Sequence, residues 1–223
     1  MTTQEAKVDS LLHSNGTACD RREDAQFLAR YFDRYREVLF GAAVTDHLIE
    51  LKEMIQATSQ AGKKVVIVGN GGSAAIAAHG ATDLSKNAKV RCVCFNDASL
   101  ITCLANDFGY EHWVEAALSM YADKGDLIIL ISSSGKSPNM VRAADYARGR
   151  GLRLVTFTGF APTNALRQCG DLNLWVDSRA YNIVENTHQI WLLAVCDLLI
   201  GDAEYPASPP AEEVLTALPG SNF

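Results

Sequence analysis

Two loops rich in glycine and serine carry groups that could bind an anion. The first, Gly69–Ser73, follows the apolar run Val65–Val68, and the second, Ser132–Ser137, follows the apolar run Leu127–Ile131. A stretch with helical periodicity comes after each loop. Backbone N–H groups at a helix start lack intrahelical partners and lie at the positive end of the helix dipole, so together with hydroxyls they bind phosphate. The two loops therefore point to a small phosphorylated ligand.

The second loop is the more specific of the two. Ser132, Ser133, Ser134 and Ser137 cluster around Gly135 at the expected start of a helix. Their hydroxyls, with the free N–H groups of the helix start, match the acceptor oxygens of a phosphate monoester. The alternative is a polar strand-to-helix turn in which one serine caps the helix. The density of hydroxyls favours the phosphate site.

The glycine loop gives a weaker signal. Gly69, Gly71 and Gly72 allow the backbone to approach an oxygen-rich ligand, although an ordinary tight turn would use the same residues. The loop is not a dinucleotide fingerprint, because Ala74 stands where the spacing G-x-G-x-x-G needs glycine, and it lacks the GK[ST] ending of a P-loop. We therefore expect no nucleotide cofactor.

Helices and strands that would position these loops alternate along the chain. Two amphipathic helices, 24–40 and 45–59, come first. Strands are expected at 65–68, 90–95, 127–131, 154–158 and 172–176, and further helices at 74–84, 98–104, 111–121, 139–149, 164–169 and 184–200. Such alternation predicts an α/β fold with a five-stranded parallel sheet covered on both faces. Ligands of these folds bind beyond the carboxyl ends of the strands, where both loops lie.

The composition describes one globular domain. The chain has 223 residues and a net charge of −6, which argues against nucleic acid as a direct partner because phosphate backbones need basic surfaces. We expect a loose N-terminal arm over 1–23, a single domain over 24–202 and an irregular tail over 203–223. No stretch reaches the ~18 apolar residues of a membrane-spanning helix, and the N-terminus lacks the apolar core of a signal peptide. These features favour a cytoplasmic protein without a membrane partner.

The cysteines agree with that compartment. They form no CxxC pair, so we expect reduced, buried thiols that pack in the core, with a disulfide or metal set as the less favoured alternative. The six are Cys19, Cys92, Cys94, Cys103, Cys169 and Cys196.

Two pairs of side chains could transfer protons or bind a metal. His79 and Asp83 are four residues apart on the helix after the glycine loop, so they share a face. Glu185 and His188 are three apart at the start of the last helix and also share a face. Each pair could instead be a salt bridge at the surface or at a subunit interface.

Four segments occur in the order seen in sugar isomerase (SIS) domain proteins: Gly69–Ser73, Asn106–Tyr110, Ser132–Ser137 and Thr156–Gly159. Over residues 24–202 the chain most resembles the phosphoheptose isomerases. The resemblance implies a flavodoxin-like three-layer sandwich and a homotetramer with active sites shared between subunits. It also implies an aldose–ketose isomerase that converts sedoheptulose 7-phosphate to D-glycero-D-manno-heptose 7-phosphate, or acts on a close variant.

The resemblance also implies roles for the loop residues. The serine loop would hold the phosphate, and other residues would contact the sugar. The substrate-binding set is then Asn70, Gly71, Gly72, Ser73, Asn106, Asp107, Ser132, Ser133, Ser134 and Ser137.

The chain departs from the family at the metal site. Phosphoheptose isomerases bind zinc through a His and a Glu four apart, a Gln at the start of the last helix and a His eight residues further on. Here these positions hold His79, Asp83, Glu185 and Leu193, and leucine can neither bind zinc nor carry a proton. Asp83 and Glu185 are the acid–base candidates.

Three outcomes stay open from the sequence. His79, Asp83 and Glu185 could form a rebuilt zinc site with water as the fourth ligand. The isomerisation could also run without metal, with Asp83 or Glu185 as base. The third outcome is a non-catalytic interaction protein, because Cys196-Asp197-Leu198 resembles the last helix of a SIS relative that promotes replication initiation and also lacks the shuttle His.

Overall fold

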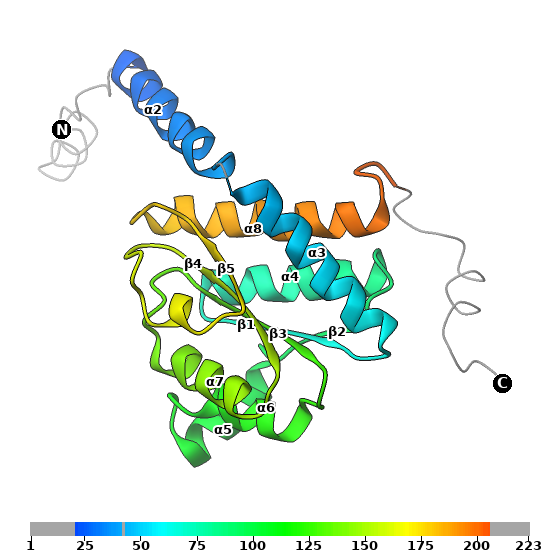
Figure 1. Cartoon of the computed structure of the whole chain (residues 1–223). Helices are drawn as coiled ribbons and strands as arrows, with labels where there is room; N and C mark the ends of the chain where they lie inside the picture. Colours follow the sequence, from blue (N-terminus) through cyan, green and yellow to red (C-terminus); the bar gives the residue numbers. More distant parts are fainter. Residues whose placement is uncertain (1–20, 42, 206–223) are drawn as a thin grey trace, which may run out of the picture.

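The computed structural model of the protein describes residues 21–41 and 43–205 (Figure 1). Almost all of the expected N-terminal arm, and the tail from residue 206 onward, lie outside the described residues. The residues between them form one sheet and the helices that cover it.

The sheet has five parallel strands in the order β2-β1-β3-β4-β5, as the alternation predicted. Every residue of β1 and β3 is buried, because helices cover both faces of the sheet, and this explains their uninterrupted apolar runs. The strands are β1 (Val65–Gly69), β2 (Cys92–Cys94), β3 (Leu127–Ser132), β4 (Arg153–Thr158) and β5 (Leu172–Trp175).

Helices form a layer on each side of the sheet (Figure 1). On one side lie α3 (Val44–Gln60), α4 (Gly72–Lys86) and α8 (Tyr181–Ile200). On the other lie α5 (Ala98–Phe108), α6 (Trp113–Tyr121) and α7 (Pro138–Gly149), with the short 3-10 turn η1 (Leu166–Gln168). The three-layer sandwich is therefore confirmed.

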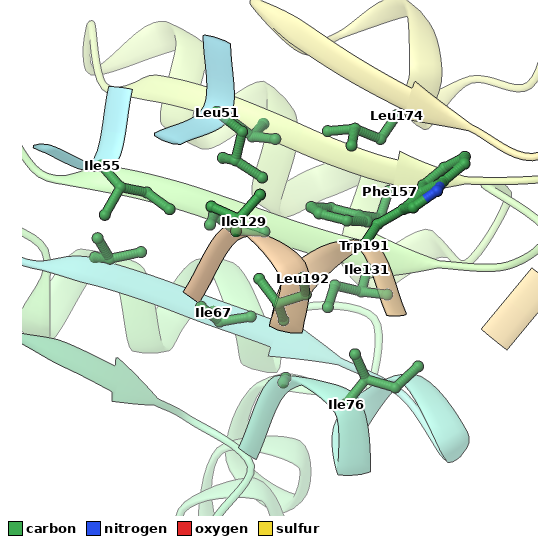
Figure 2. Packing of buried hydrophobic residues seen from close by; sticks show 14 of the residues in the cluster. Leu51, Ile55, Ile67, Ile76, Ile129, Ile131, Phe157, Leu174, Trp191 and Leu192 are labelled. Atoms are coloured by element: carbon green, nitrogen blue, oxygen red, sulfur yellow. The ribbon is translucent and has the colours of Figure 1, made fainter. Parts of the chain in front are cut away.

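The core next to α8 fixes the helices that frame the ligand-binding edge. Trp191 and Leu192 of α8 pack with Ile76 of α4 and with Ile131 and Phe157 of the sheet (Figure 2). Within the described residues, α8 is the one helix long and apolar enough to cross a membrane, but 44% of its apolar window is buried. It is a core helix of the domain.

The strand order places the two loops side by side. In the order 2-1-3-4-5, ligands bind at the switch point between β1 and β3. The register pairs Gly69 at the end of β1 with Ile131 near the end of β3, so both loops leave the sheet at the same edge. The fold thus positions them for one shared ligand.

Three sequence predictions need correction. The strand expected at 90–95 is only Cys92–Cys94, at the edge of the sheet. Asn106 belongs to the last turn of α5 rather than to a loop, because the helix continues to Phe108. The described cysteines are free, but only Cys196 among them is buried, and Cys103 is exposed.

Candidate functional site

The glycine loop lets a carboxylate approach the start of α4. Gly71 has φ +56°, a conformation that L side chains rarely adopt, and it precedes the first helical residue, Gly72. A Cβ on Gly72 would overlap the carboxylate of Glu185, which comes from α8. Glycine is therefore needed at position 72 for Glu185 to lie where it does.

Asn70 is held by two side chains that sequence reasoning missed. Its amide exchanges two hydrogen bonds with Asn139 at the start of α7, at 3.0 and 2.9 Å. The Tyr110 hydroxyl donates to Asn70 Oδ1 at 3.3 Å. Tyr110 ended one of the four family segments, whereas Asn139 had no signal beyond its place after the serine loop.

Three hydroxyls of the serine loop lie around its turn into α7. Ser132 Oγ is 3.4 Å from Ser137 Oγ, and Ser134 Oγ accepts from the backbone N–H of Lys136 at 3.3 Å. Gly135 has φ +62° and packs so tightly on Asn164 that a Cβ would overlap it. The helix α7 starts directly after Ser137, so its unpaired N–H groups lie at the loop, as the sequence predicted.

Ser133 connects the serine loop with α8. Its hydroxyl donates to Glu185 Oε1 at 3.3 Å, and its carbonyl accepts from the Gly159 N–H at 2.9 Å. Ser133 is buried and Glu185 is half-buried. The carboxylate of Glu185 therefore lies between the two loops, against Gly72 on one side and Ser133 on the other.

His79 and Asp83 form the expected pair on α4, but at a different place. His79 Nε2 lies 3.4 Å from Asp83 Oδ2, and His79 Nδ1 lies 3.0 Å from Nε2 of Gln189 on α8. Asn87 donates to the other oxygen of Asp83 at 3.2 Å. Asp83 lies about 16 Å along α4 from Gly72, at 1.5 Å per residue, so the structure does not bring it together with Glu185.

These donors do not fit a zinc ion as they are arranged. Both ring nitrogens of His79 and both oxygens of Asp83 already have partners. Glu185 faces Ser133, and Leu193 is a half-buried leucine. Across residues 21–41 and 43–205, no three His, Cys, Asp or Glu side chains gather as a metal site would require.

His188 does not share the site with Glu185. It is fully buried, its Nε2 lies 3.1 Å from the Thr158 carbonyl, and its ring packs edge-on against Phe157. Burial lowers the pKa of His188 to about 4, so the ring is neutral at physiological pH. His188 therefore stabilises the end of β4 rather than meeting a ligand.

The remaining sequence candidates are Ser73, Asn106 and Asp107. Ser73 is buried in the first turn of α4. Asn106 and Asp107 are exposed at the end of α5, where Asn106 donates to Asp107 at 2.9 Å. A separate cavity of about 590 Å³ lies between α4 and the β2 edge, lined by residues that include Thr82, Ser85 and Cys94. It holds none of the loop residues and is not the candidate site.

The comparisons with known proteins agree with this architecture. The SIS domain family matches residues 30–159, more than half of the chain, and the chain belongs to this family.

Two individual relatives and one solved structure, all named phosphoheptose isomerases, are similar to the chain. The chain is 38% identical over 112 residues to a phosphoheptose isomerase of Sodalis glossinidius, an alignment that spans 48% of the chain and 58% of that protein. It is 32% identical over 148 residues to a phosphoheptose isomerase of Aliarcobacter butzleri, which spans 64% of the chain and 78% of that protein. The fold is similar to that of phosphoheptose isomerase from Neisseria gonorrhoeae, with a TM-score of 0.73, 24% identity, and coverage of 80% and 98% of the two chains.

Proposed function

We propose that the protein is an aldose–ketose isomerase of the phosphoheptose isomerase kind, which converts sedoheptulose 7-phosphate to D-glycero-D-manno-heptose 7-phosphate. The names of the curated relatives support the reaction and substrate. One observation about this chain carries the proposal: the carboxylate of Glu185 lies between a phosphate-type serine loop and the glycine loop. An anion anchor next to a positioned carboxylate is what isomerisation of a sugar phosphate requires.

The serine loop anchors the phosphate in this proposal. Ser132, Ser134 and Ser137 supply hydroxyls, and the start of α7 supplies N–H groups and the positive end of its dipole. Ser133 is directed to Glu185 and positions that carboxylate instead. Asn70, fixed by Asn139 and Tyr110, contacts sugar hydroxyls together with Gly71 and Gly72 of the same loop. Asn106 and Asp107 contact them from the end of α5.

Glu185 moves the carbon proton. A general base must take a proton from the carbon beside the carbonyl, and the same group can return it to the neighbouring carbon. Ser133 holds the carboxylate before the substrate arrives and Gly72 leaves room for it, which raises the effective concentration of the base. Asp83 lies further along α4, away from Glu185. In this proposal it positions His79, which it contacts.

The working protein is a homotetramer in the cytoplasm in this proposal. The helix α2 (Arg21–Leu39) has no buried residue, and it carries an aromatic face in which Phe27 stacks on Tyr31. Phe27 and Phe32 are 59% and 62% exposed. Aromatic side chains exposed together on one helix are typical of an interface, and a second copy of this chain would cover them.

A single assay tests the function. Purified protein is incubated with sedoheptulose 7-phosphate, with and without zinc, and NMR follows the appearance of the aldose heptose 7-phosphate. We expect turnover in both conditions. Binding of the sugar phosphate without turnover in either condition would instead support a non-catalytic SIS protein.

A further inference from the structure

The side chains of Gln189 on α8 and His79 on α4 contact each other between the two helices that border the site. Gln189 Nε2 lies 3.0 Å from His79 Nδ1. An amide nitrogen only donates, so Gln189 donates to Nδ1 in this contact. The other ring nitrogen, Nε2, faces Asp83. The His79 ring thus lies between the amide of Gln189 and the carboxylate of Asp83.

Asp83 and Asn87 surround the other side of the His79 ring. His79 Nε2 lies 3.4 Å from Asp83 Oδ2, and Asn87 donates to the second oxygen of Asp83 at 3.2 Å. These contacts hold the His79 ring beside the amide nitrogen of Gln189.

One N–H of Gln189 stays available to a ligand. The amide has two N–H donors, and His79 takes one. The other has no partner among the described residues, and Gln189 lies one turn beyond Glu185 on the same face of α8. The two helices run in parallel, since Glu185 meets Gly72 and Leu192 meets Gly80. A sugar chain anchored at the serine loop and extending past Glu185 reaches Gln189 next.

We propose that Gln189 is a catalytic hydrogen-bond donor for the enediolate oxygen, and that His79 and Asp83 are the residues that position it. The inference rests on the proposed isomerase function. Removal of the carbon proton by Glu185 forms the carbon–carbon double bond and moves the carbonyl electron pair onto oxygen. That oxygen needs a metal or a fixed donor. Here the Gln189 N–H supplies it, in a site whose residues do not fit zinc.

Every proton and electron pair of the proposed step is accounted for within the substrate and Glu185. Glu185 returns the proton to the former carbonyl carbon, and the hydroxyl proton passes from one substrate oxygen to the other. Gln189 only donates a hydrogen bond and keeps its protons. No oxidant, reductant or other reactant is consumed.

The test is the kinetics of Gln189→Leu with sedoheptulose 7-phosphate. Loss of a donor that acts only in the transition state is expected to lower kcat on the order of 10²-fold, with KM changed less than about threefold. Gln189→Glu has nearly the same shape but places an acceptor there, and it should lose as much. Gln168→Leu is the matched control, because Gln168 is exposed and, among the described residues, its side-chain amide contacts only the Thr163 carbonyl, so its kcat should be unchanged.

A second readout measures metal directly. Wild-type protein treated with a chelator is expected to keep its kcat, and calorimetric titration with zinc should show no stoichiometric binding. Zinc-dependent turnover that the chelator abolishes would overturn the inference, as would an unchanged kcat in both Gln189 variants. Absence of turnover by wild-type protein would overturn the proposed function itself, and the role of Gln189 with it.

Discussion

The Glu185 carboxylate lies in the space that a side chain at position 72 would fill, so only glycine fits there. A Cβ at position 72 overlaps the Glu185 carboxylate, so Gly72→Ala must displace it. We expect kcat to fall by up to about 10²-fold, because a displacement near 1 Å at a catalytic group has that effect. Steady-state kinetics measure the loss. Gly149→Ala is the control, since nothing lies within 4 Å of a Cβ there, and an equal loss in both variants would contradict the role of Gly72.

The serine hydroxyls divide between two tasks. Ser134→Ala removes a hydroxyl proposed to bind phosphate, and a charge-assisted hydrogen bond contributes about 1.5–3 kcal/mol, so affinity should fall tenfold or more. Ser133→Ala removes the contact to Glu185 and should lower kcat more than affinity. Calorimetry with the sugar phosphate measures the first effect and kinetics the second. Unchanged affinity in Ser134→Ala would remove this hydroxyl from the phosphate site.

Site residues could be predicted from the sequence where their neighbours along the chain mark them. The serine loop was found because its hydroxyls are consecutive, and Glu185 because it starts a recognisable helix. Asn139 and Gln189 were not found, since each matters only through a partner distant in sequence, Asn70 and His79. The pairing of Asp83 with Glu185 in one metal site came from the positions of the zinc ligands in the family that the chain resembles. The arrangement of α4 and α8 separates them.

At the scale of elements, helices and strands followed the periodicity of apolar residues. The buried strands β1 and β3 were expected almost to the residue, because a strand covered on both faces is apolar throughout. The edge strand β2 was overestimated, since the apolar residues Val90 and Phe95 lie outside its register with β1, and the Val90 N–H bonds to the Leu84 carbonyl instead. The end of α5 was placed too early because Asn106-Asp107 resembles a turn sequence.

The buried His188 links α8 to β4 and makes stability depend on pH. Burial lowers its pKa to about 4, below the unfolded value of 6.5, so protonation favours the unfolded chain. The contribution is fully present above pH 6.5 and is lost as pH falls toward 4, by about 3 kcal/mol. Urea unfolding at several pH values measures it. In His188→Gln the slope between pH 6.5 and 4 should be shallower, and an unchanged slope would contradict this role of His188.

For the whole molecule, strand order and layer arrangement were predictable because alternating strands and helices allow few connections. The projecting helix α2 was predicted as an amphipathic element, but its position away from the core was not (Figure 1). An apolar stripe predicts burial without saying against what. In this chain Phe27 and Phe32 of α2 stay exposed, which is the basis for the proposed assembly.

The assembly can be tested on α2. Phe27→Asp combined with Phe32→Asp places charges on the exposed aromatic face and should shift the tetramer to smaller species, because burying each aromatic ring stabilises an interface by about 1.5–3 kcal/mol. Light scattering after size exclusion measures the mass. Asp33→Ala, at an exposed ion pair on the same helix, should stay tetrameric. A double variant that stays tetrameric would exclude this face as an interface.

The measurement that tests the central claim most directly is carbon–proton exchange by Glu185. Wild-type protein and Glu185→Gln are each incubated with sedoheptulose 7-phosphate in deuterated water and followed by NMR. We predict that wild-type protein places deuterium on the carbon beside the carbonyl while forming the aldose, and that Glu185→Gln, although folded, does so at least about 10²-fold more slowly. Equal exchange rates in the two proteins would contradict the role of Glu185 as the base.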